Sequence, residues 1–303
     1  MNIVITGSSG FVGQNLLRYL ADFNIVQLNR EQLKSPTIEQ LGNCEAIIHL
    51  AGKAHDLKKI SNPDKYYQVN YELTKKLYDA FLKSDAKKFI FVSSVKAAAD
   101  SVEDVLTEDH QPNPKTDYGK SKLMAEQYVQ SQILPAGKSF YILRPCMIHG
   151  PGNKGNLNLL YKFVRKGIPY PLAAFENKRS FLSVENLCFV IEQLLKKDIK
   201  SDVYNVTDDK ALSTSEVVEI LANSSNKKAK LWRISSGIIK SFASIGDMLR
   251  LPLNSERLQK LTESYVVSNA KIKAALGVEL PITTVEGLTM TAKSFKNTSL
   301  TQS

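Results

Sequence analysis

The feature that most constrains the fold stands at the start of the chain, where a short apolar run meets a glycine-rich loop. Asn2–Thr6 has the composition of a buried strand, and Gly7, Gly10 and Gly13 follow before a helical pattern that begins at about Phe11. In a strand–loop–helix unit with this spacing, the first glycine permits a tight turn and the second lets the backbone approach a pyrophosphate. The third lets the helix pack closely on the strand, and the N–H groups at the helix start bind the negative charge. The loop therefore predicts a dinucleotide-binding unit.

The rest of the first half alternates short apolar runs with helical patterns, which is typical of βαβ units and a parallel sheet. The expected strands are 25–28, 46–50, 89–93 and 139–143, and the expected helices are 65–82 and 118–131. After the Gly-, Pro- and Asn-rich stretch 145–156 the chain is mostly helical, apart from a return to the sheet near 203–206. We predict an α/β fold with a Rossmann-type doubly wound parallel sheet in residues 1–150. Residues 151–303 are expected to form a smaller, mostly helical substrate-binding lobe.

The composition narrows the classes of partner and the compartment. The net charge is +10, but the lysines occur in short pairs without a block of five like charges or a nucleic-acid-binding motif, so no nucleic-acid partner is expected. Cys44, Cys146 and Cys188 lack metal-like or CxxC spacing, which favours buried free thiols in a reducing compartment and no metal. No signal-peptide pattern and no run of about 18 apolar residues are found. We therefore expect a soluble, cytoplasmic protein with no integral membrane segment.

The end of the second expected strand bears on which dinucleotide binds. Asn29 and Arg30 stand where a site for NAD usually places Asp or Glu, about 20 residues beyond the loop, to bind the ribose 2′-hydroxyl. Asparagine does not repel a 2′-phosphate, and arginine pairs with one through two hydrogen bonds. NADP is therefore favoured, with NAD kept open. The alternative for Arg30 is a position over the adenine or a solvent-exposed pair with Glu31.

A second motif, YGKSK at 118–122, carries the chemistry. Tyr118 and Lys122 are four residues apart, so they share one face of the expected helix. A phenol has a pKa near about 10, and a neighbouring ammonium lowers that pKa by stabilising the phenolate. The pair suits general acid–base catalysis of a carbinol–carbonyl exchange. The alternative, a solvent-facing helix turn, is disfavoured by the preceding glycine loop and by the strand that ends at Ser93-Ser94.

Taken together, these motifs resemble those of the extended short-chain dehydrogenase/reductase family, the NAD-dependent epimerase/dehydratase group that acts on nucleotide sugars. The resemblance is carried by TGSSGFVG at 6–13, HLAGKAH at 49–55, Asn70, FVSS at 91–94, YGKSK at 118–122, LRP at 143–145 and HGPGN at 149–153. It implies a catalytic set of Ser94, Tyr118 and Lys122, in which Ser94 holds the reacting sugar oxygen and Lys122 also holds the nicotinamide ribose. The cofactor-binding residues that it implies are Gly7, Ser9, Gly10, Phe11, Val12, Gly13, Asn29, Arg30, Leu50, Ala51, Gly52, Asn70, Tyr118 and Lys122.

Within this family, the stretches around 143–160 and 179–187 most resemble bacterial 4-ketoreductases that form UDP-N-acetylquinovosamine from UDP-4-keto-6-deoxy-N-acetylglucosamine. The implied activity is NAD(P)-dependent reduction of the 4-keto group of a UDP-sugar for surface polysaccharide synthesis. The alternative is a UDP-sugar 4-epimerase of the UDP-glucose 4-epimerase type, which uses the same Ser/Tyr/Lys set. Met147, where many epimerases carry Asn, weakens that alternative. A non-catalytic dinucleotide sensor would not need all three catalytic residues.

The resemblance also implies how the substrate is held. The expected substrate-binding residues are His55, Lys96, Asn156, Arg179 and Arg257. Two guanidiniums, from Arg179 and Arg257, would clamp a pyrophosphate through charge-assisted hydrogen bonds. The structural alternative for Arg179 is a salt bridge with Glu176 or Glu185.

Four further expectations concern assembly and isolated residues. Helices 65–82 and 118–131 resemble those of the four-helix dimer contact in this family, so a homodimer is expected. His49 is interpreted as a core histidine with its hydrogen bonds satisfied, and Asp117 as a helix N-cap. Lys53 and His149 receive no role.

Overall fold

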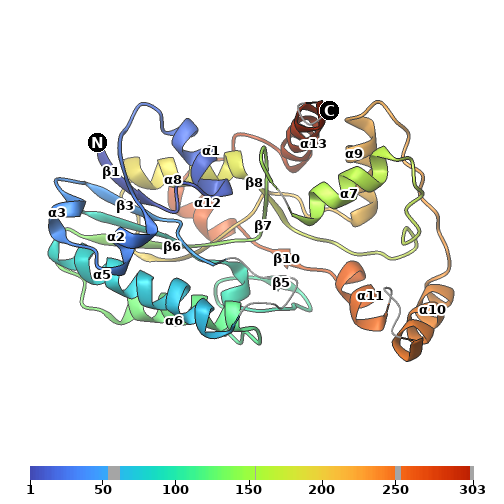
Figure 1. Ribbon diagram of the computed structural model, residues 1–303, viewed down its shortest axis with the longest axis horizontal. Coiled ribbons are helices and arrows are strands. Elements are labelled where there is room, and N and C mark those ends of the chain that lie inside the picture. Colours follow the sequence, from blue (N-terminus) through green and yellow to red (C-terminus); the bar gives the residue numbers. More distant parts are fainter. Residues whose placement is uncertain (54–61, 154, 250–253, 301–303) are drawn as a thin grey trace.

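The computed structural model describes residues 1–53, 62–153, 155–249 and 254–300. A six-stranded sheet lies at one end of the molecule, and every neighbouring pair of strands in it runs parallel (Figure 1). Its order is β2 (Asn24–Leu28), β1 (Asn2–Thr6), β3 (Ala46–His49), β4 (Lys88–Val92), β6 (Ser139–Pro145) and β9 (Asp202–Val206). The predicted α/β class with a doubly wound parallel sheet is confirmed.

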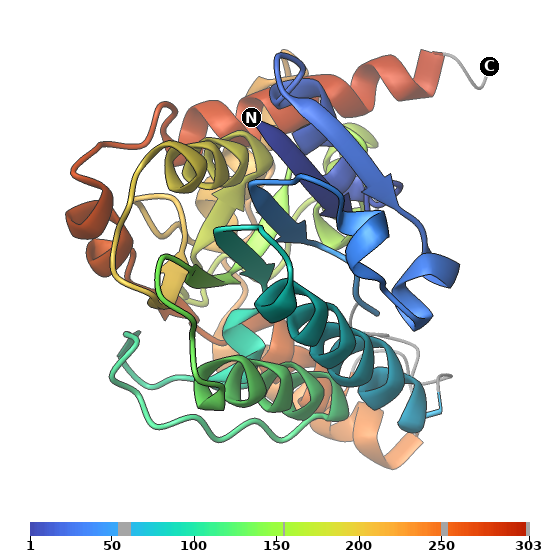
Figure 2. The same cartoon turned by 90° about the vertical axis from the view of Figure 1, so that its left-hand side faces the viewer.

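Helices cover both faces of the sheet, which explains why its central strands are mostly apolar. Ile3 and Ile5 pack into the core on one face and Val4 into the core on the other, as the two-residue period of a strand requires. The first face is covered by α1 (Phe11–Tyr19), α8 (Val184–Lys196) and α12 (Ala270–Leu276), and the second by α2 (Arg30–Lys34), α3 (Ile38–Leu41), α5 (Leu73–Lys83) and α6 (Asp117–Ser131) (Figure 2). Two helices of the first face come from beyond residue 150, so the second half of the chain completes this core. The predicted division at residue 150 stays a prediction.

The order of the strands creates a crevice at one edge of the sheet. The chain passes from β1 to β2 on one side, and β3 then pairs with the opposite side of β1. Loops that leave the carboxyl ends of β1 and β3 therefore diverge, and ligands of doubly wound sheets bind at such a point. The two loops that leave here are the glycine loop and Leu50-Ala51-Gly52. The fold thus brings together the two segments that the sequence assigned to the cofactor.

A second lobe lies beyond this edge of the sheet (Figure 1). Its helices are α7 (Asn156–Arg165), α9 (Thr214–Asn223), α10 (Ser236–Leu249), α11 (Ser255–Thr262) and α13 (Thr284–Leu300). Two small parallel sheets join the lobe to the rest: β7 (Met147–His149) with β8 (Phe181–Ser183), and β5 (Val105–Leu106) with β10 (Val266–Val267). The lobe has an apolar core of its own, which includes Tyr161, Leu221 and Leu288. Among the described residues, no helix is both long enough and apolar enough to cross a bilayer.

Two local predictions need correction. The helix expected over 65–82 is divided into α4 (Asp64–Tyr66), a π-helical segment η1 (Tyr67–Glu72) and α5. Thr116, not Asp117, is the N-cap of α6, because the backbone of Thr116 is extended and its Oγ1 accepts a hydrogen bond from the N–H of Gly119 at 3.2 Å. Asp117 already lies in the first turn, where its carboxylate accepts a hydrogen bond from the Tyr67 hydroxyl at 3.0 Å.

A buried ion pair fixes α6 to the sheet. Glu126 on α6 and Arg144 on β6 are almost completely buried. The Nε of Arg144 donates to both carboxylate oxygens of Glu126 at 3.1 Å, and its Nη2 donates to one of them at 2.5 Å. The hydroxyl of Ser93, just after β4, donates to the same carboxylate. Several charge-assisted hydrogen bonds of this kind are needed to offset the cost of taking two charges out of water.

Removing one partner of this pair leaves an uncompensated charge in the core. We expect Arg144→Met to lower the free energy of unfolding by about 3–5 kcal/mol, as for other buried pairs that lose one member. The double variant Glu126→Leu/Arg144→Met should recover most of that loss, since no buried charge remains. Urea unfolding followed by circular dichroism measures both.

The matched control is Lys34→Met, which breaks an exposed pair with Glu31 and should change the stability by less than about 1 kcal/mol. An effect of Arg144→Met no larger than that of the control would contradict a structural role for the buried pair.

Candidate active site

The glycine loop is shaped by two close backbone approaches. Gly7 has a φ of +71°, and a Cβ there would lie 2.6 Å from the backbone nitrogen of Ala51. A Cβ on Gly13 would lie 2.4 Å from the carbonyl oxygen of Gly7. Only glycine fits both positions, so the loop packs tightly against α1 and against the segment after β3. Gly10, the N-cap of α1, has no side chain to bind the first N–H groups of that helix, and this terminus fits the pyrophosphate of a dinucleotide.

A buried hydrogen-bond chain fixes the carboxyl ends of β1 and β3. His49 Nδ1 lies 2.7 Å from Thr6 Oγ1, and its Nε2 lies 2.9 Å from Thr74 Oγ1. Thr74 donates its own proton to the carbonyl of Asn70 at 2.7 Å, so it accepts from Nε2, and Nδ1 accepts from Thr6. Thr6 Oγ1 in turn accepts from the N–H of Ala51 at 3.2 Å. Burial lowers the pKa of His49 to about 3, and the ring is the satisfied, neutral core histidine that the sequence predicted.

Asn70, predicted to contact the cofactor, is buried and clamps the loop that follows β3. Its Oδ1 accepts from the N–H of Lys53 at 2.7 Å, and its Nδ2 donates to the carbonyl of Lys53 at 3.2 Å and to Ser121 Oγ at 3.0 Å. The neighbouring Gly52 has no side chain to separate this loop from Lys122, whose Nζ would lie 3.1 Å from a Cβ there. Asn70 therefore holds the loop next to Lys122, and Lys53 takes part through its backbone.

The structure brings Ser94, Tyr118 and Lys122 together at the carboxyl edge of the sheet. Ser94 follows β4 and begins the short 3₁₀ helix η2 (Val95–Ala97), and Tyr118 lies in the first turn of α6. Burial raises the pKa of Tyr118, while a hydrogen bond with Ser94 acts in the opposite direction. The lowering of this pKa that the sequence predicted is therefore wrong in direction, because burial of the phenol outweighs the hydrogen bond with Ser94.

Lys122 lies one helical turn beyond Tyr118 and is buried. Its Nζ donates to the carbonyl of Val92 at 3.0 Å and lies 4.9 Å from the centre of the Phe91 ring. Burial lowers the pKa of Lys122 to about 8, and the Glu126 carboxylate, a further turn along α6, opposes that shift. An ammonium held in this way retains its charge at neutral pH and has shed most of its water.

The residues that the sequence analysis assigned to the adenosine end of the dinucleotide lie after β2. Asn29 is the N-cap of α2 and exchanges two hydrogen bonds with Gln32, at 3.0 and 2.8 Å. Arg30 is exposed in the first turn of that helix. The carboxylate of Glu31 pairs with Lys34 at 2.7 Å, so the alternative pairing of Glu31 with Arg30 is not found.

A mostly apolar cavity of about 530 Å³ opens in the second lobe beside Arg179. It is lined by Met147, Leu157, Leu159, Leu160, Phe163, Tyr170, Pro171, Leu172, Arg179, Phe181, Thr214, Val217 and Leu261. The guanidinium of Arg179 is half-buried and donates to the carbonyl of Glu263 at 3.1 Å and to that of Lys260. Its nearest carboxylate is that of Glu263, at 3.7 Å, rather than Glu176 or Glu185.

Lys96, another predicted substrate ligand, lies close enough to Arg179 for their charges to interact. Its ammonium donates to the carbonyl of Asp100 at 2.7 Å and lies 4.3 Å from the centre of the Tyr265 ring. Burial lowers the pKa of Lys96, and the positive charge of Arg179 adds to this shift. Two cations from distant parts of the sequence therefore converge between the sheet and the lobe.

The other predicted substrate residues are not brought to this point by any described contact. Arg257 lies on the exposed side of α11, one turn before Lys260. Asn156 is the first residue of α7, and its side chain falls outside the described part of the structure. His55 also falls outside the described residues.

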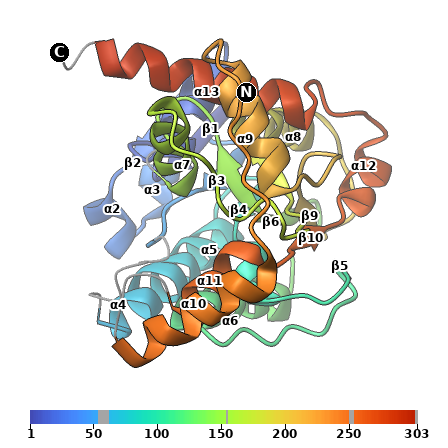
Figure 3. The ribbon, with the colours of Figure 1, turned by 90° about the vertical axis from the view of Figure 1, so that its right-hand side faces the viewer.

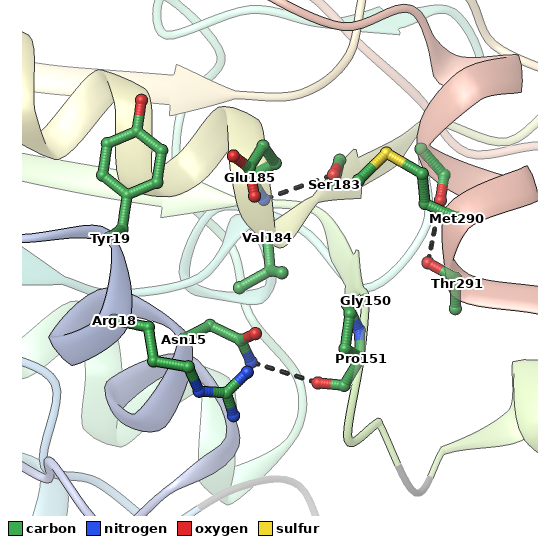
Figure 4. A pocket seen from close by; sticks show the side chains of 11 residues that line it. Asn15, Arg18, Tyr19, Gly150, Pro151, Ser183, Val184, Glu185, Met290 and Thr291 are labelled. Carbon is green, nitrogen blue, oxygen red and sulfur yellow. Dashed lines mark hydrogen bonds between the residues drawn. The ribbon is translucent and has the colours of Figure 1, made fainter. Parts of the chain in front are cut away.

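A second cavity, of about 340 Å³, lies between α1, the start of α8 and α13 (Figure 4). None of the predicted substrate or catalytic residues lines it. The amide of Asn15 closes one side by donating to the carbonyl of Pro151 at 3.1 Å. His149, left without a role by the sequence, is buried behind this cavity, where its Nδ1 lies 2.9 Å from Thr291 Oγ1 and its Nε2 lies 3.8 Å from Asp208. We assign His149 to the packing of β7 against α13.

Sequence reasoning missed the residues that hold the site in shape. They are Thr6, Thr74, Ser93, Ser121, Glu126 and Arg144. One signal was present for Glu126, since it continues the four-residue spacing of Tyr118 and Lys122 on a helix face that is otherwise buried. The hydroxyl residues carry no such pattern, because their partners lie on other elements.

Comparison with known proteins agrees with this geometry. Residues 3–207 match the model of the NAD dependent epimerase/dehydratase family. The chain is 30% identical over 97% of its length to a Vibrio cholerae UDP-glucose 4-epimerase, of which it covers 95%. It is 32% identical over 75% of its length to an N-acetyl-alpha-D-glucosaminyl-diphospho-ditrans,octacis-undecaprenol 4-epimerase of Escherichia coli O157:H7, of which it covers 73%. A Pseudomonas aeruginosa UDP-2-acetamido-2,6-beta-L-arabino-hexul-4-ose reductase is 24% identical, with 80% of this chain and 63% of that protein aligned.

Solved structures share the whole fold. The UDP-glucuronic acid 4-epimerase from Bacillus cereus in complex with NAD matches with a TM-score of 0.76 at 17% identity, over 98% of this chain and 99% of that chain. RMD from Pseudomonas aeruginosa, complexed with NADPH, matches with a TM-score of 0.74 at 22% identity, over 98% of both chains. The family match, the glycine loop and the Ser94, Tyr118 and Lys122 cluster lead to one conclusion: the chain belongs to the NAD-dependent epimerase/dehydratase family of extended short-chain dehydrogenases/reductases and is an NAD(P)-dependent nucleotide-sugar enzyme.

Proposed function

We propose that the protein reduces the 4-keto group of a UDP-sugar in the cytoplasm, in a pathway of surface polysaccharide synthesis. The observation that carries this proposal is the convergence of Ser94, Tyr118 and Lys122 on the crevice beside the glycine loop. A carbonyl reductase needs a proton donor that is neutral at pH 7 and a fixed positive charge that stabilises its anion. The raised pKa of Tyr118 and the buried ammonium of Lys122 meet both requirements.

The roles of the three residues follow from their environment. When bound, the reduced nicotinamide supplies a hydride to C4 of the sugar. Ser94 donates a hydrogen bond to the C4 oxygen and polarises the carbonyl, and Tyr118 delivers its phenolic proton to that oxygen as the alkoxide forms. Lys122 stabilises the resulting phenolate until a proton returns from solvent. The product is the C4 alcohol.

The rival proposal is a UDP-sugar 4-epimerase, which would use the same three residues and regenerate its cofactor in each turnover. The apolar side chain of Met147 favours the reductase, because it lines the cavity where a polar amide would hold the sugar of an epimerase. The test is to mix purified protein with UDP-4-keto-6-deoxy-N-acetylglucosamine and NADPH or NADH, and to follow the nicotinamide absorbance. Conversion of UDP-glucose or UDP-N-acetylglucosamine to its C4 epimer without consumption of added cofactor would replace this proposal by the rival one.

We further propose a homodimer formed through α5 and α6. Both helices cover the same face of the sheet and carry tyrosine and charged side chains on their outer sides, such as the pair of Tyr128 with Asp79 and Lys75. Light scattering at micromolar concentration tests this assembly.

Tyr118→Phe removes the proposed proton donor and keeps the ring. We expect turnover to fall by at least about 10²-fold, the scale of general acid catalysis. Cofactor affinity, measured by fluorescence titration, should survive because the phenol only supplements the contacts of the glycine loop. The control Tyr204→Phe removes a hydroxyl on β9 that donates to the carbonyl of Lys200, away from the site and from α5 and α6, and should retain turnover. Near-normal turnover in Tyr118→Phe would exclude this acid.

Arg30→Ala tests the preference for NADP. If the guanidinium pairs with the 2′-phosphate, the affinity for NADPH should fall by about 1.5–3 kcal/mol, as for a charged hydrogen bond. The affinity for NADH should barely change, since NADH lacks that phosphate. Lys34→Ala is the matched control, because it removes a cation of the same helix that is already paired with Glu31. Equal losses for both cofactors, or none, would refute the pairing.

Arg179→Ala tests the clamp on the diphosphate. Loss of a charge-assisted contact should raise the dissociation constant for UDP about 10- to 100-fold in calorimetric titration. The matched variant Glu263→Gln breaks the salt bridge of Arg179 but keeps the guanidinium, so its UDP affinity should stay close to normal. If a folded Arg179→Ala protein binds UDP as tightly as the original, Arg179 serves only to hold α11 in place.

A further inference from the structure

Helix α10 exposes large apolar side chains to solvent. Ile238, Phe242 and Ile245 are all exposed, with Phe242 at 64%, and their spacing of four and three residues places them on one face. The adjoining side of the helix is already used, because Ile239 and Ala243 are buried in the core of the lobe. An ordinary surface helix needs only one apolar stripe, so the outer stripe of α10 is not explained by the packing of the lobe.

Two more exposed apolar side chains lie on the segments next to α10, one four residues before it in the chain and one on α11, which contacts it. Trp232 is 56% exposed and lies in an extended segment that pairs with the cavity wall, through hydrogen bonds between its backbone and Tyr170 and Ala173. Leu261, on the neighbouring helix α11, is exposed and also lines the cavity. Figure 3 shows α10 and α11 together on the face of the lobe, and Figure 1 shows α10 at the end of the molecule opposite β1. We call this set, Trp232, Ile238, Phe242, Ile245 and Leu261, the α10 surface.

The charge around the α10 surface is strongly positive. Between residues 227 and 250 the sequence has one acidic residue, Asp247. The basic residues in the same stretch are Lys227, Lys228, Lys230, Arg233, Lys240 and Arg250. Those from 227 to 240 are exposed. Lys240 is the basic residue on α10 itself, and Lys227, Lys228, Lys230 and Arg233 precede the helix in the segment that carries Trp232. Basic side chains beside exposed Trp, Phe and Ile are typical of surfaces that contact an anionic membrane.

We propose that the α10 surface docks onto an anionic lipid bilayer and holds the second lobe against it. The apolar side chains would enter the headgroup region, where an indole is favoured, and the lysines would pair with lipid phosphates. A second copy of the chain would bring two strongly basic surfaces together, which their mutual repulsion opposes. The docking does not depend on the reaction at Tyr118, and it would place the cavity beside Arg179 close to the lipid surface.

Sedimentation with vesicles of phosphatidylcholine containing about 30% phosphatidylglycerol tests this docking. We expect the full-length protein to bind these vesicles and to bind pure phosphatidylcholine vesicles much more weakly. Two double variants should each bind at least about tenfold more weakly. Ile238→Ser/Phe242→Ser removes apolar area that would be buried in the bilayer, and Lys230→Glu/Lys240→Glu reverses two charges. Circular dichroism checks that both variants are folded.

Two matched controls change the same residue types elsewhere. Ile133→Ser alters a side chain that is 93% exposed in the loop after α6, and Lys200→Glu alters an exposed lysine just before β9. Both should bind vesicles like the original protein. Absence of binding by the original protein, or equal loss in variants and controls, would overturn the proposal. So would a dimer, seen by light scattering, that dissociates on Phe242→Ser, because the occupant would then be a second copy of the chain.

Discussion

The buried ion pair between Glu126 and Arg144 is the interaction on which the arrangement of the site depends. Glu126 lies on the same face of α6 as Tyr118 and Lys122, while Arg144 belongs to β6 and Ser93 adjoins Ser94 at the end of β4. One carboxylate thus fixes the rotation and height of the helix that carries Tyr118 and Lys122, relative to the strand that leads into Ser94. The same charge opposes the loss of the proton from Lys122. Because such a pair is stable only when all its hydrogen bonds are made, it tolerates little displacement of α6.

Around this pair, neutral hydrogen bonds define the cofactor side of the site. The chain from Ala51 through Thr6, His49 and Thr74 ties two strand ends to the helix beneath them. Asn70 extends it to the loop at Lys53 and to α6 through Ser121. The histidine is neutral here because burial lowers its pKa, and the buried ammonium of Lys122 adds to this shift. The crevice is therefore rigid where a dinucleotide would lie, and electrostatic catalysis depends on such rigidity.

The second lobe differs from the sheet region because apolar packing, not a buried ion pair, dominates its interior. Its core is apolar, its cavity is mostly apolar, and its outermost helix presents both charge and apolar side chains to solvent. The contacts that reach back toward the sheet include the hydroxyl of Tyr265, which donates to the carbonyl of Ala99, and the short pairs β7–β8 and β5–β10. The second half of the chain thus contributes both to the core that covers the sheet and to the separate core of the lobe.

The amino-acid sequence was enough to predict the class of fold and to single out Ser94, Tyr118 and Lys122 as the candidate reacting groups. The apolar runs, the glycine spacing and the four-residue interval from Tyr118 to Lys122 are local patterns, and each depends only on the geometry of a strand, a turn or a helix. The sequence predicted Asp117 as the N-cap of α6, and this was wrong because Thr116 is the N-cap. Both residue types are good N-caps, and only the backbone conformation decides between them. Tertiary structure alone decided that Glu263, not Glu176 or Glu185, faces Arg179, that Glu126 pairs with Arg144, and that α10 leaves a second apolar face uncovered. These features join residues far apart in the chain, or depend on what packs against a helix, and no local periodicity encodes the choice of a distant partner.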